Sequence, residues 1–145
     1  MTTTAMNSLE TPTISQVAEL LAHNGYDVQD AASGVLLVRE LETSVAFQVA
    51  LQGSILFMTL NLTSVPTASI TVGMMRQMLD AHNGISTSAF QLYDIQGGQT
   101  AITLNNFCTL QDMGPEDRDD ILSSASYLMV DLVAARDLLQ PAQAS

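Results

Sequence analysis

The sequence predicts an α+β fold in which an antiparallel sheet is packed with helices. The chain has 145 residues, 47% hydrophobic and 13% charged, so it is long and apolar enough to bury one core. Large apolar residues occupy every second position from Val45 to Leu51, as in a half-buried strand. Between Ile121 and Leu139 the apolar residues recur instead at helical spacing.

The first part of the chain is expected to form one helix and then three strands. The helix begins with a capping box, in which Thr13 is the N-cap and Gln16 follows three residues later, and it ends at Asn24-Gly25. Residues 26–33 are interpreted as a connection with some strand character. Short polar or glycine turns then separate three apolar runs, which predict strands over residues 35–41, 45–51 and 55–62.

The second part is expected to form a helix, a hairpin and a long last helix. The second helix is predicted from Ser69 to Asn83, with Gly84 as its stop signal. Gly97-Gly98 predicts a turn between strands over residues 88–95 and 99–104. The last helix is predicted to begin near Pro115 and to end at Pro141. The complete order is therefore helix, three strands, helix, two strands, helix.

The chain contains no linker, repeat or low-complexity segment that would divide it. We therefore expect one domain over residues 13–140. A small, polar N-terminal tail of residues 1–12 precedes it, and a C-terminal tail of residues 141–145 follows.

The charge balance bears on the partners that the protein can have. The chain carries 15 acidic residues against four arginines and no lysine, for a formal net charge of −11. Nucleic acids and anionic lipid surfaces need basic residues to neutralise them, so we expect neither as a partner. No apolar run is long enough to span a bilayer. The lone Cys108 and the absence of a secretory signal in residues 1–10 predict a cytoplasmic protein.

We find no residues arranged for catalysis and predict a protein that is not an enzyme and needs no cofactor or metal. His23 and His82 lie near the predicted ends of two helices, where an imidazolium interacts favourably with the helix dipole. Cys108 is interpreted as a structural cysteine, because no activating signature surrounds it.

An acidic cluster surrounds the start of the last helix. We interpret it as a solvated group that complements the positive end of the helix dipole, with contact to a basic partner and a metal site as alternatives. Its members are Asp112, Glu116, Asp117, Asp119 and Asp120.

Two features point to protein binding. Met74, Met75 and Met78 lie on the second predicted helix, and methionines there can either fill a core or line an adaptable binding surface. The third predicted strand is apolar on both faces, because Ile55 and Phe57 alternate with other large apolar residues. A second subunit or a client could cover the additional apolar face.

The element order, chain size and acidity resemble the type III secretion chaperone fold and the related YbjN-type domains of bacteria, over about residues 13–140. The stretch from Met75 to His82, followed by Ile85 to Phe90 with Ser88-Ala89-Phe90 as its anchor, resembles the YjfI family. That bacterial family has no known function and is often encoded beside phage-shock-type proteins. The resemblances imply a non-enzymatic homodimer. In secretion chaperones an extended client segment wraps the acidic dimer surface, although the Met- and Thr-rich middle of this chain departs from a dedicated chaperone.

Our leading hypothesis is a chaperone- or adaptor-like homodimer that binds another polypeptide with a basic or extended segment. The copies are expected to meet through the second helix and the strand near Phe90. A regulatory or sensory protein of a bacterial envelope stress response is the alternative, and an enzyme using scattered carboxylates is a third. The residues expected to bind protein are Met74, Met75, Met78, Phe90, Ile55 and Phe57.

Overall fold

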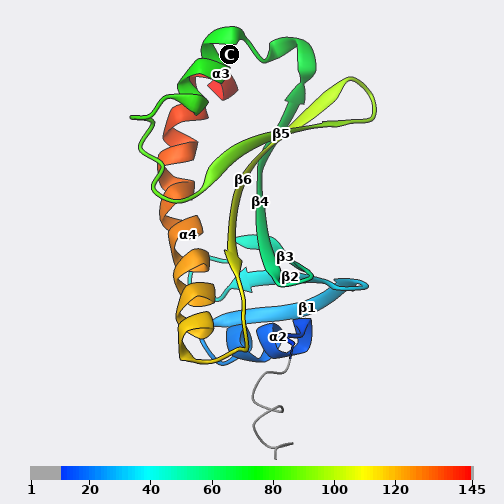
Figure 1. Cartoon of the computed structure of the whole chain (residues 1–145). Coiled ribbons are helices and arrows are strands. Elements are labelled where there is room, and N and C mark those ends of the chain that lie inside the picture. The colour runs from blue at the N-terminus through cyan, green and yellow to red at the C-terminus, as the bar shows by residue number, and fades with distance from the viewer. Residues whose placement is uncertain (1–10, 145) are drawn as a thin grey trace, which may run out of the picture. The chain divides into compact units, whose positions relative to one another are not determined.

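The computed structural model describes residues 11–144, with side chains as far as Gln140. Residues 1–10 of the expected N-terminal tail lie outside this description. Figure 1 labels the α-helices and strands of the chain. In chain order the elements are α2 (Ile14–Ala22), β1 (Tyr26–Ala32), β2 (Val35–Glu40), β3 (Ala46–Gln52), β4 (Ile55–Pro66), the 3-10 turn η1 (Thr67–Ser69), α3 (Val72–Leu79), β5 (Ala89–Ile95), β6 (Gln99–Thr109) and α4 (Pro115–Ala144).

The predicted α+β class is confirmed, but the predicted order of elements is wrong by one strand. The strands form a six-stranded antiparallel sheet in the order β1-β2-β3-β4-β6-β5. The additional strand is β1, which pairs with β2 from Tyr26↔Glu40 onward. Only the start of β1 faces the core, where Tyr26 contacts Phe47 edge to face, while most of its later residues are exposed. An edge strand of this kind lacks the apolar alternation by which the other strands were found.

The contacts of the chain divide the described residues into two compact units. Unit 1 comprises residues 11–58 and 107–125, and unit 2 comprises residues 59–106 and 126–144. The single domain over residues 13–140 stays a prediction.

In unit 1, α2 contacts β1 and adds its apolar residues to the core on the sheet. The predicted capping box is confirmed: the Gln16 N–H donates to Thr13 Oγ1 at 3.2 Å, and the Thr13 N–H donates to Gln16 Oε1 at 2.9 Å. This cap fixes the start of α2 and directs Val17 and Leu21 inward, where both are fully buried. The other buried apolar residues of this unit include Leu36, Val38, Phe47, Val49, Leu56, Met58, Ile121 and Ala125.

Unit 2 has its own apolar cluster, centred on the buried residues Met78, Ile102 and Leu139. The helix that supplies Met78 is shorter than the predicted Ser69–Asn83. It begins at Val72 because Thr71 caps it, with Thr71 Oγ1 accepting the Met74 N–H at 3.1 Å.

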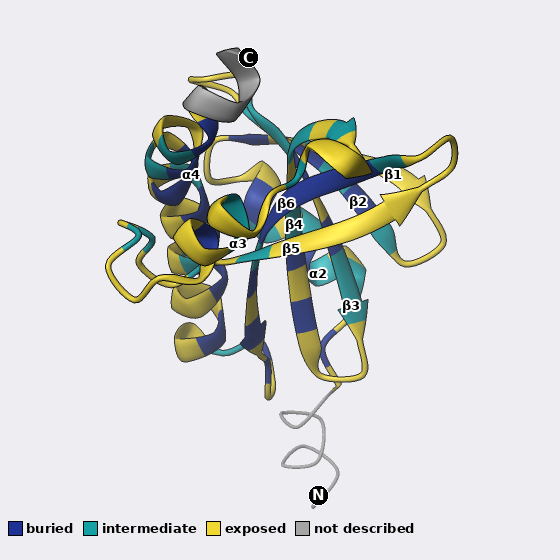
Figure 2. Cartoon of the chain, turned by 90° about the horizontal axis from the view of Figure 1, so that it is seen from above, coloured by how far each residue is buried: buried dark blue, intermediate teal, exposed yellow. Residues whose placement is uncertain are grey.

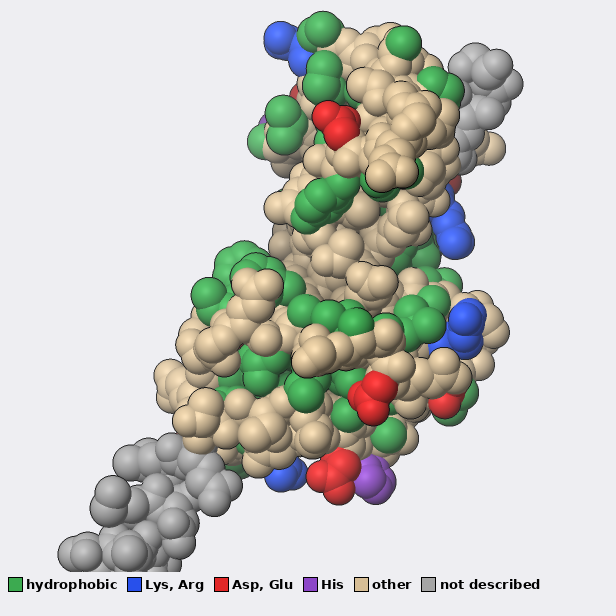
Figure 3. Space-filling model, turned by 90° about the vertical axis from the view of Figure 1, so that its right-hand side faces the viewer, with side chains coloured by type: hydrophobic (Ala, Val, Ile, Leu, Met, Phe, Trp, Pro, Cys, Tyr) green, Lys and Arg blue, Asp and Glu red, His purple; other side chains and the backbone are tan. Residues whose placement is uncertain are grey.

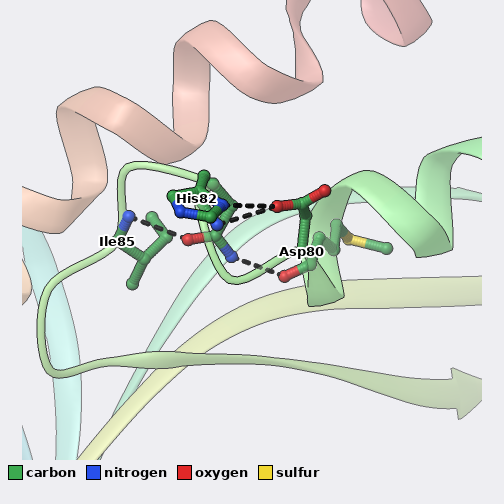
Figure 4. Close-up of polar contacts among 5 residues, drawn as sticks. Asp80, His82 and Ile85 are labelled. Atoms are coloured by element: carbon green, nitrogen blue, oxygen red, sulfur yellow. Dashed lines mark hydrogen bonds and ion pairs between the residues drawn. The ribbon is translucent and has the colours of Figure 1, made fainter.

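Polar side chains end α3 early, after Leu79 (Figure 4). Asn83 Nδ2 donates to the Met78 carbonyl at 2.6 Å, and Asp80 Oδ1 accepts the His82 N–H at 2.8 Å. These bonds satisfy backbone groups that a longer helix would have paired internally. They also place His82 beyond the helix, exposed, with its Nδ1 3.7 Å from Asp80 Oδ1, and not in the last turn as predicted.

Three elements extend past their predicted ends. β4 continues to Pro66 and β6 to Thr109, instead of ending at residues 62 and 104. Asn106, a polar residue that does not indicate a strand by type, is buried in β6, where its Nδ2 donates to Thr87 Oγ1 at 3.0 Å. α4 continues through Pro141 to Ala144, so the expected stop signal is not its end.

Among the described helices, none combines the length and the apolar character needed to cross a membrane.

Candidate protein-binding surfaces

One exposed apolar surface of unit 1 consists of Ile55, Phe57 and Phe107, which we call the aromatic patch. Their exposed fractions are 36%, 38% and 62%. Ile55 and Phe57 share one face of β4, since side chains two residues apart in a strand point the same way. The Phe57 and Phe107 rings contact each other with centroids 6.5 Å apart. The apolar residues between them, Leu56 and Met58, point to the core.

On β2 and β3, the face that points away from the core carries small or apolar side chains and few charges. Leu37 lies opposite Gln48, and Val35 opposite Ala50. Arg39 is the basic residue here, and its guanidinium donates to the Ser44 carbonyl at 2.7 Å. Figure 3 shows hydrophobic side chains gathered in patches on one side of the chain, with scattered charged side chains between them.

Acidic residues are distributed unevenly between the units. The described residues of unit 1 contain ten acidic side chains against Arg39 and Arg118, a formal charge of −8. Those of unit 2 contain four against Arg76 and Arg136, a formal charge of −2. The aromatic patch therefore belongs to the more acidic unit, which favours a partner that brings basic side chains.

One member of the predicted acidic cluster is not solvated. Asp117 is 4% exposed, and its Oδ2 accepts the N–H groups of Gln111, Asp112 and Met113 at 2.7, 2.9 and 2.8 Å. Burial alone would raise the pKa of Asp117, but these backbone hydrogen bonds outweigh it and hold the pKa below its ordinary value. Asp117 thus organises the turn before α4, in which Met113 has a left-handed φ of 60°.

A second buried carboxylate, Asp131, was not singled out from the sequence. It lies on α4 and is 1% exposed. Its Oδ1 accepts the Ser86 N–H and the Ser86 hydroxyl, both at 2.8 Å. Its Oδ2 accepts the Thr87 and Ser88 N–H groups at 3.3 and 3.0 Å. The carboxylate therefore fastens the segment that leads into β5. The sequence signal that could have identified this buried carboxylate is the position of Asp131 between Leu128 and Leu132, on the apolar face of the helix.

The pKa of Asp131 is also held below its ordinary value. Burial acts to raise it, but the hydrogen bonds from Ser86 and Ser88 prevail. We expect Asp117 and Asp131 to make the free energy of unfolding decrease at acid pH. A carboxyl group whose pKa is lower in the folded state stabilises the fold above the unfolded pKa of about 3.9, and this contribution is lost as the pH falls through the folded value.

Urea unfolding between pH 7 and pH 2.5 measures this effect. The double variant Asp117→Asn, Asp131→Asn should lose less stability than the wild type over the acid part of this range. Equal losses in the two proteins would show that other carboxyl groups cause the acid dependence.

Neither histidine nor the cysteine shows an arrangement for catalysis. His23 caps α2, with its Nδ1 2.7 Å from the Glu19 carbonyl. Cys108 is buried, and burial raises the pKa of its thiol to about 11, so the thiol is protonated at neutral pH. Within the described part of the chain, no group of three or more His, Cys, Asp or Glu side chains is placed to hold a metal ion.

The residues predicted to bind protein fall into two groups. Met78 is buried in the unit 2 cluster, and Met74, Met75 and Phe90 are partly buried against it. All three methionines therefore contact the core of unit 2, and Met74 and Met75 remain half-exposed, so their role in protein binding stays a prediction. Ile55 and Phe57 lie in unit 1, on the aromatic patch. Phe107 completes that patch but was not chosen from the sequence, because β6 was predicted to end before it.

The outer strand of unit 2 is a further exposed surface. β5 is the last strand in the sheet order and pairs with β6. In Figure 2 β5 is exposed along most of its length, whereas the adjoining part of β6 is buried. Its exposed apolar side chains are Leu92, Tyr93 and Ile95.

Comparison with known proteins supports the fold. No family model matches this chain. No curated protein matches its sequence. Among solved structures, that of YbjN from E. coli, a proposed transcription regulator, is similar, with a TM-score of 0.66 and 13% sequence identity over 91% of this chain and 96% of that chain. The predicted YbjN-like fold is thereby confirmed. At this identity the likeness shows the fold alone, and the YjfI-like assignment stays a prediction.

Proposed function

We propose that this protein is a non-enzymatic, chaperone- or adaptor-like binding module that acts as an acidic homodimer and binds another polypeptide. The observation that supports this most directly is the aromatic patch. Its two phenylalanines contact each other on an exposed sheet face, where the strands hold them in position. Aromatic side chains on a rigid surface are the residue type that contributes most to protein interfaces, since they bury much area at little entropic cost.

The charge of unit 1 defines the partner further. A segment with apolar side chains could cover the aromatic patch, while basic side chains beside them would meet a unit of formal charge −8. Such attraction raises the association rate and is screened by salt. We therefore propose a polypeptide partner that has both apolar and basic residues.

The buried polar groups support a binding role over a catalytic one. Asp117 Oδ2 accepts three backbone N–H groups, and both carboxylate oxygens of Asp131 accept backbone or hydroxyl donors, so these carboxylates hold the chain in position. The Cys108 thiol, with its raised pKa, is a poor nucleophile.

Charging the aromatic patch should weaken partner binding strongly. A partner isolated by affinity capture from the native host would be titrated with the wild type and with Phe107→Asp. We expect at least a tenfold loss of affinity, because a carboxylate replaces exposed aromatic area and would be desolvated at the interface. The wild-type affinity should also weaken as salt increases.

Val130→Asp is the matched control. Val130 is 60% exposed, close to the 62% of Phe107, but lies on the unit 2 part of α4. This variant should bind as the wild type does. Equal binding by Phe107→Asp and the wild type would exclude the aromatic patch as the binding surface.

A regulatory role is the second candidate, and the similarity to YbjN, itself a proposed transcription regulator, favours it. With no lysine and a net charge of −11, this chain is poorly suited to contact DNA phosphates directly. We therefore propose that any regulation, including that of an envelope stress response, would act through protein contacts. The captured partner distinguishes the two roles: a secreted client indicates a chaperone, and a transcription or stress-response protein indicates a regulator.

A further inference from the structure

The open side of β5 is a strand edge available for pairing. β5 stands at one end of the sheet order, and its register with β6 runs from Ala89↔Asn105 to Ile95↔Gln99 without a shift. Residues 91–95 are all exposed (Figure 2). The backbone groups that point away from β6 are therefore positioned to pair with another strand.

β5 also lacks the features that normally protect such an edge. Proteins block edge strands with lysines, prolines, bulges or inward charges. β1, at the other end of the sheet order, has a register shift between Asp30 and Ala32 and carries two aspartates. β5 has no shift, no proline and one charged residue, Asp94, whose Oδ1 accepts the Thr100 hydroxyl at 2.9 Å.

The charge distribution indicates which strand would occupy this edge. Residues 85–109 carry one formal charge, that of Asp94, in a chain of net charge −11. A basic polypeptide would be attracted to unit 1, which has a formal charge of −8, more than to this edge. Two acidic copies, in contrast, repel each other least where each carries the least charge. A second copy of the chain therefore fits the β5 edge better than a basic partner does.

The backbone direction of β5 defines the register. The Thr103 hydroxyl donates to the Gln91 carbonyl at 3.4 Å, so that carbonyl faces β6. Successive residues of a strand direct their backbone groups to opposite sides, so the N–H and carbonyl of Leu92 face the open edge. Leu92 is the middle residue of the seven in β5, and a two-fold axis there overlaps the whole strand with its copy.

We propose that two copies pair antiparallel through β5, with Leu92 of one copy opposite Leu92 of the other. In this register Asp94 lies opposite Phe90 of the second copy, so no like charges meet, and the two leucines form an apolar cross-strand pair. The inference rests on the homodimer of the proposed function and adds the surface at which the copies meet.

Opposite charges at residue 92 test this pairing. Leu92 is 40% exposed, and in the proposed register a charge there would face the same charge in the other copy. Light scattering over a concentration series should show Leu92→Lys and Leu92→Glu each at least tenfold weaker in self-association than the wild type. An equimolar mixture of the two variants should regain association, because lysine then faces glutamate.

Gln29→Lys is the control, since it places a lysine at an exposed position of the other edge strand, β1, and should leave the wild-type mass unchanged. If a charge at residue 92 unfolds the protein, the double variant Gln91→Lys, Tyr93→Lys replaces it. Both of these side chains are exposed, and each lysine would face a lysine of the second copy.

The outcomes separate this inference from the proposed function. A wild-type dimer that these charges leave unchanged would overturn pairing through β5 and leave the homodimer standing. Failure of the Lys and Glu variants to associate with each other would overturn the register. A wild-type mass of 15.5 kDa at every concentration would overturn both the pairing and the homodimer. Partner binding is tested independently, by the titration with Phe107→Asp.

Discussion

Replacing Asp131 by alanine is expected to destabilise the protein by about 3–5 kcal/mol. The substitution removes a buried carboxylate that accepts four hydrogen bonds from Ser86, Thr87 and Ser88. A hydrogen bond to a charged group contributes about 1.5–3 kcal/mol, but Ser86 and Thr87 are exposed and can bond to water instead. This replacement, and the relief from no longer burying a charge, offset part of the total. Urea unfolding gives the change in stability, and hydrogen exchange should show lost protection at the amides of residues 86–88.

Two further substitutions define the cause. Asp131→Asn keeps the shape and one oxygen but turns an amide group toward the donors, so we expect a smaller loss than with alanine. Asp137→Ala removes an exposed aspartate of the same helix and should change stability by no more than about 0.5 kcal/mol. A loss with Asp131→Ala as small as this control would mean that the carboxylate does not hold the segment.

Leu128→Ala is expected to cost about 2–5 kcal/mol. Leu128 lies on the unit 2 part of α4 and is fully buried. Its truncation removes apolar contacts and leaves a cavity that the surrounding residues can fill only in part. Denaturant unfolding measures the effect, and Val133→Ala, at a 62% exposed position of the same helix, is the control. A change below about 0.5 kcal/mol would show that this face of α4 does not pack in a core.

Local signals predicted those parts of the fold that depend on neighbouring residues. The capping box of Thr13 and Gln16 and the turn at Gly97-Gly98 were found because their bonds and φ angles involve residues close in sequence. Both glycines have the positive φ that this turn requires. β1 was missed because its pairing with β2, and not its own pattern, makes it a strand.

The roles of the buried carboxylates depend on the fold itself. Its position at the start of a helix predicts a solvated aspartate, whereas Asp117 is buried under the turn that it organises. Asp131 bonds to residues 43 to 45 positions earlier in the chain, a pairing that no local pattern indicates. The aromatic patch was found in part, since Ile55 and Phe57 belong to a strand that was recognised. Phe107 lies in the part of β6 beyond its predicted end.

The long sequence separation between Asp131 and the segment that it binds also imposes an order of events during protein synthesis. Residues 86–88 leave the ribosome well before Asp131, because 43 to 45 residues must still be added. Until then their amides have no carboxylate to accept their hydrogen bonds, and β5 lacks its attachment to α4. A nascent chain that stops short of residue 131 therefore presents the whole β5–β6 hairpin, with its unprotected strand edge, to other nascent chains before Asp131 can hold the segment that leads into β5.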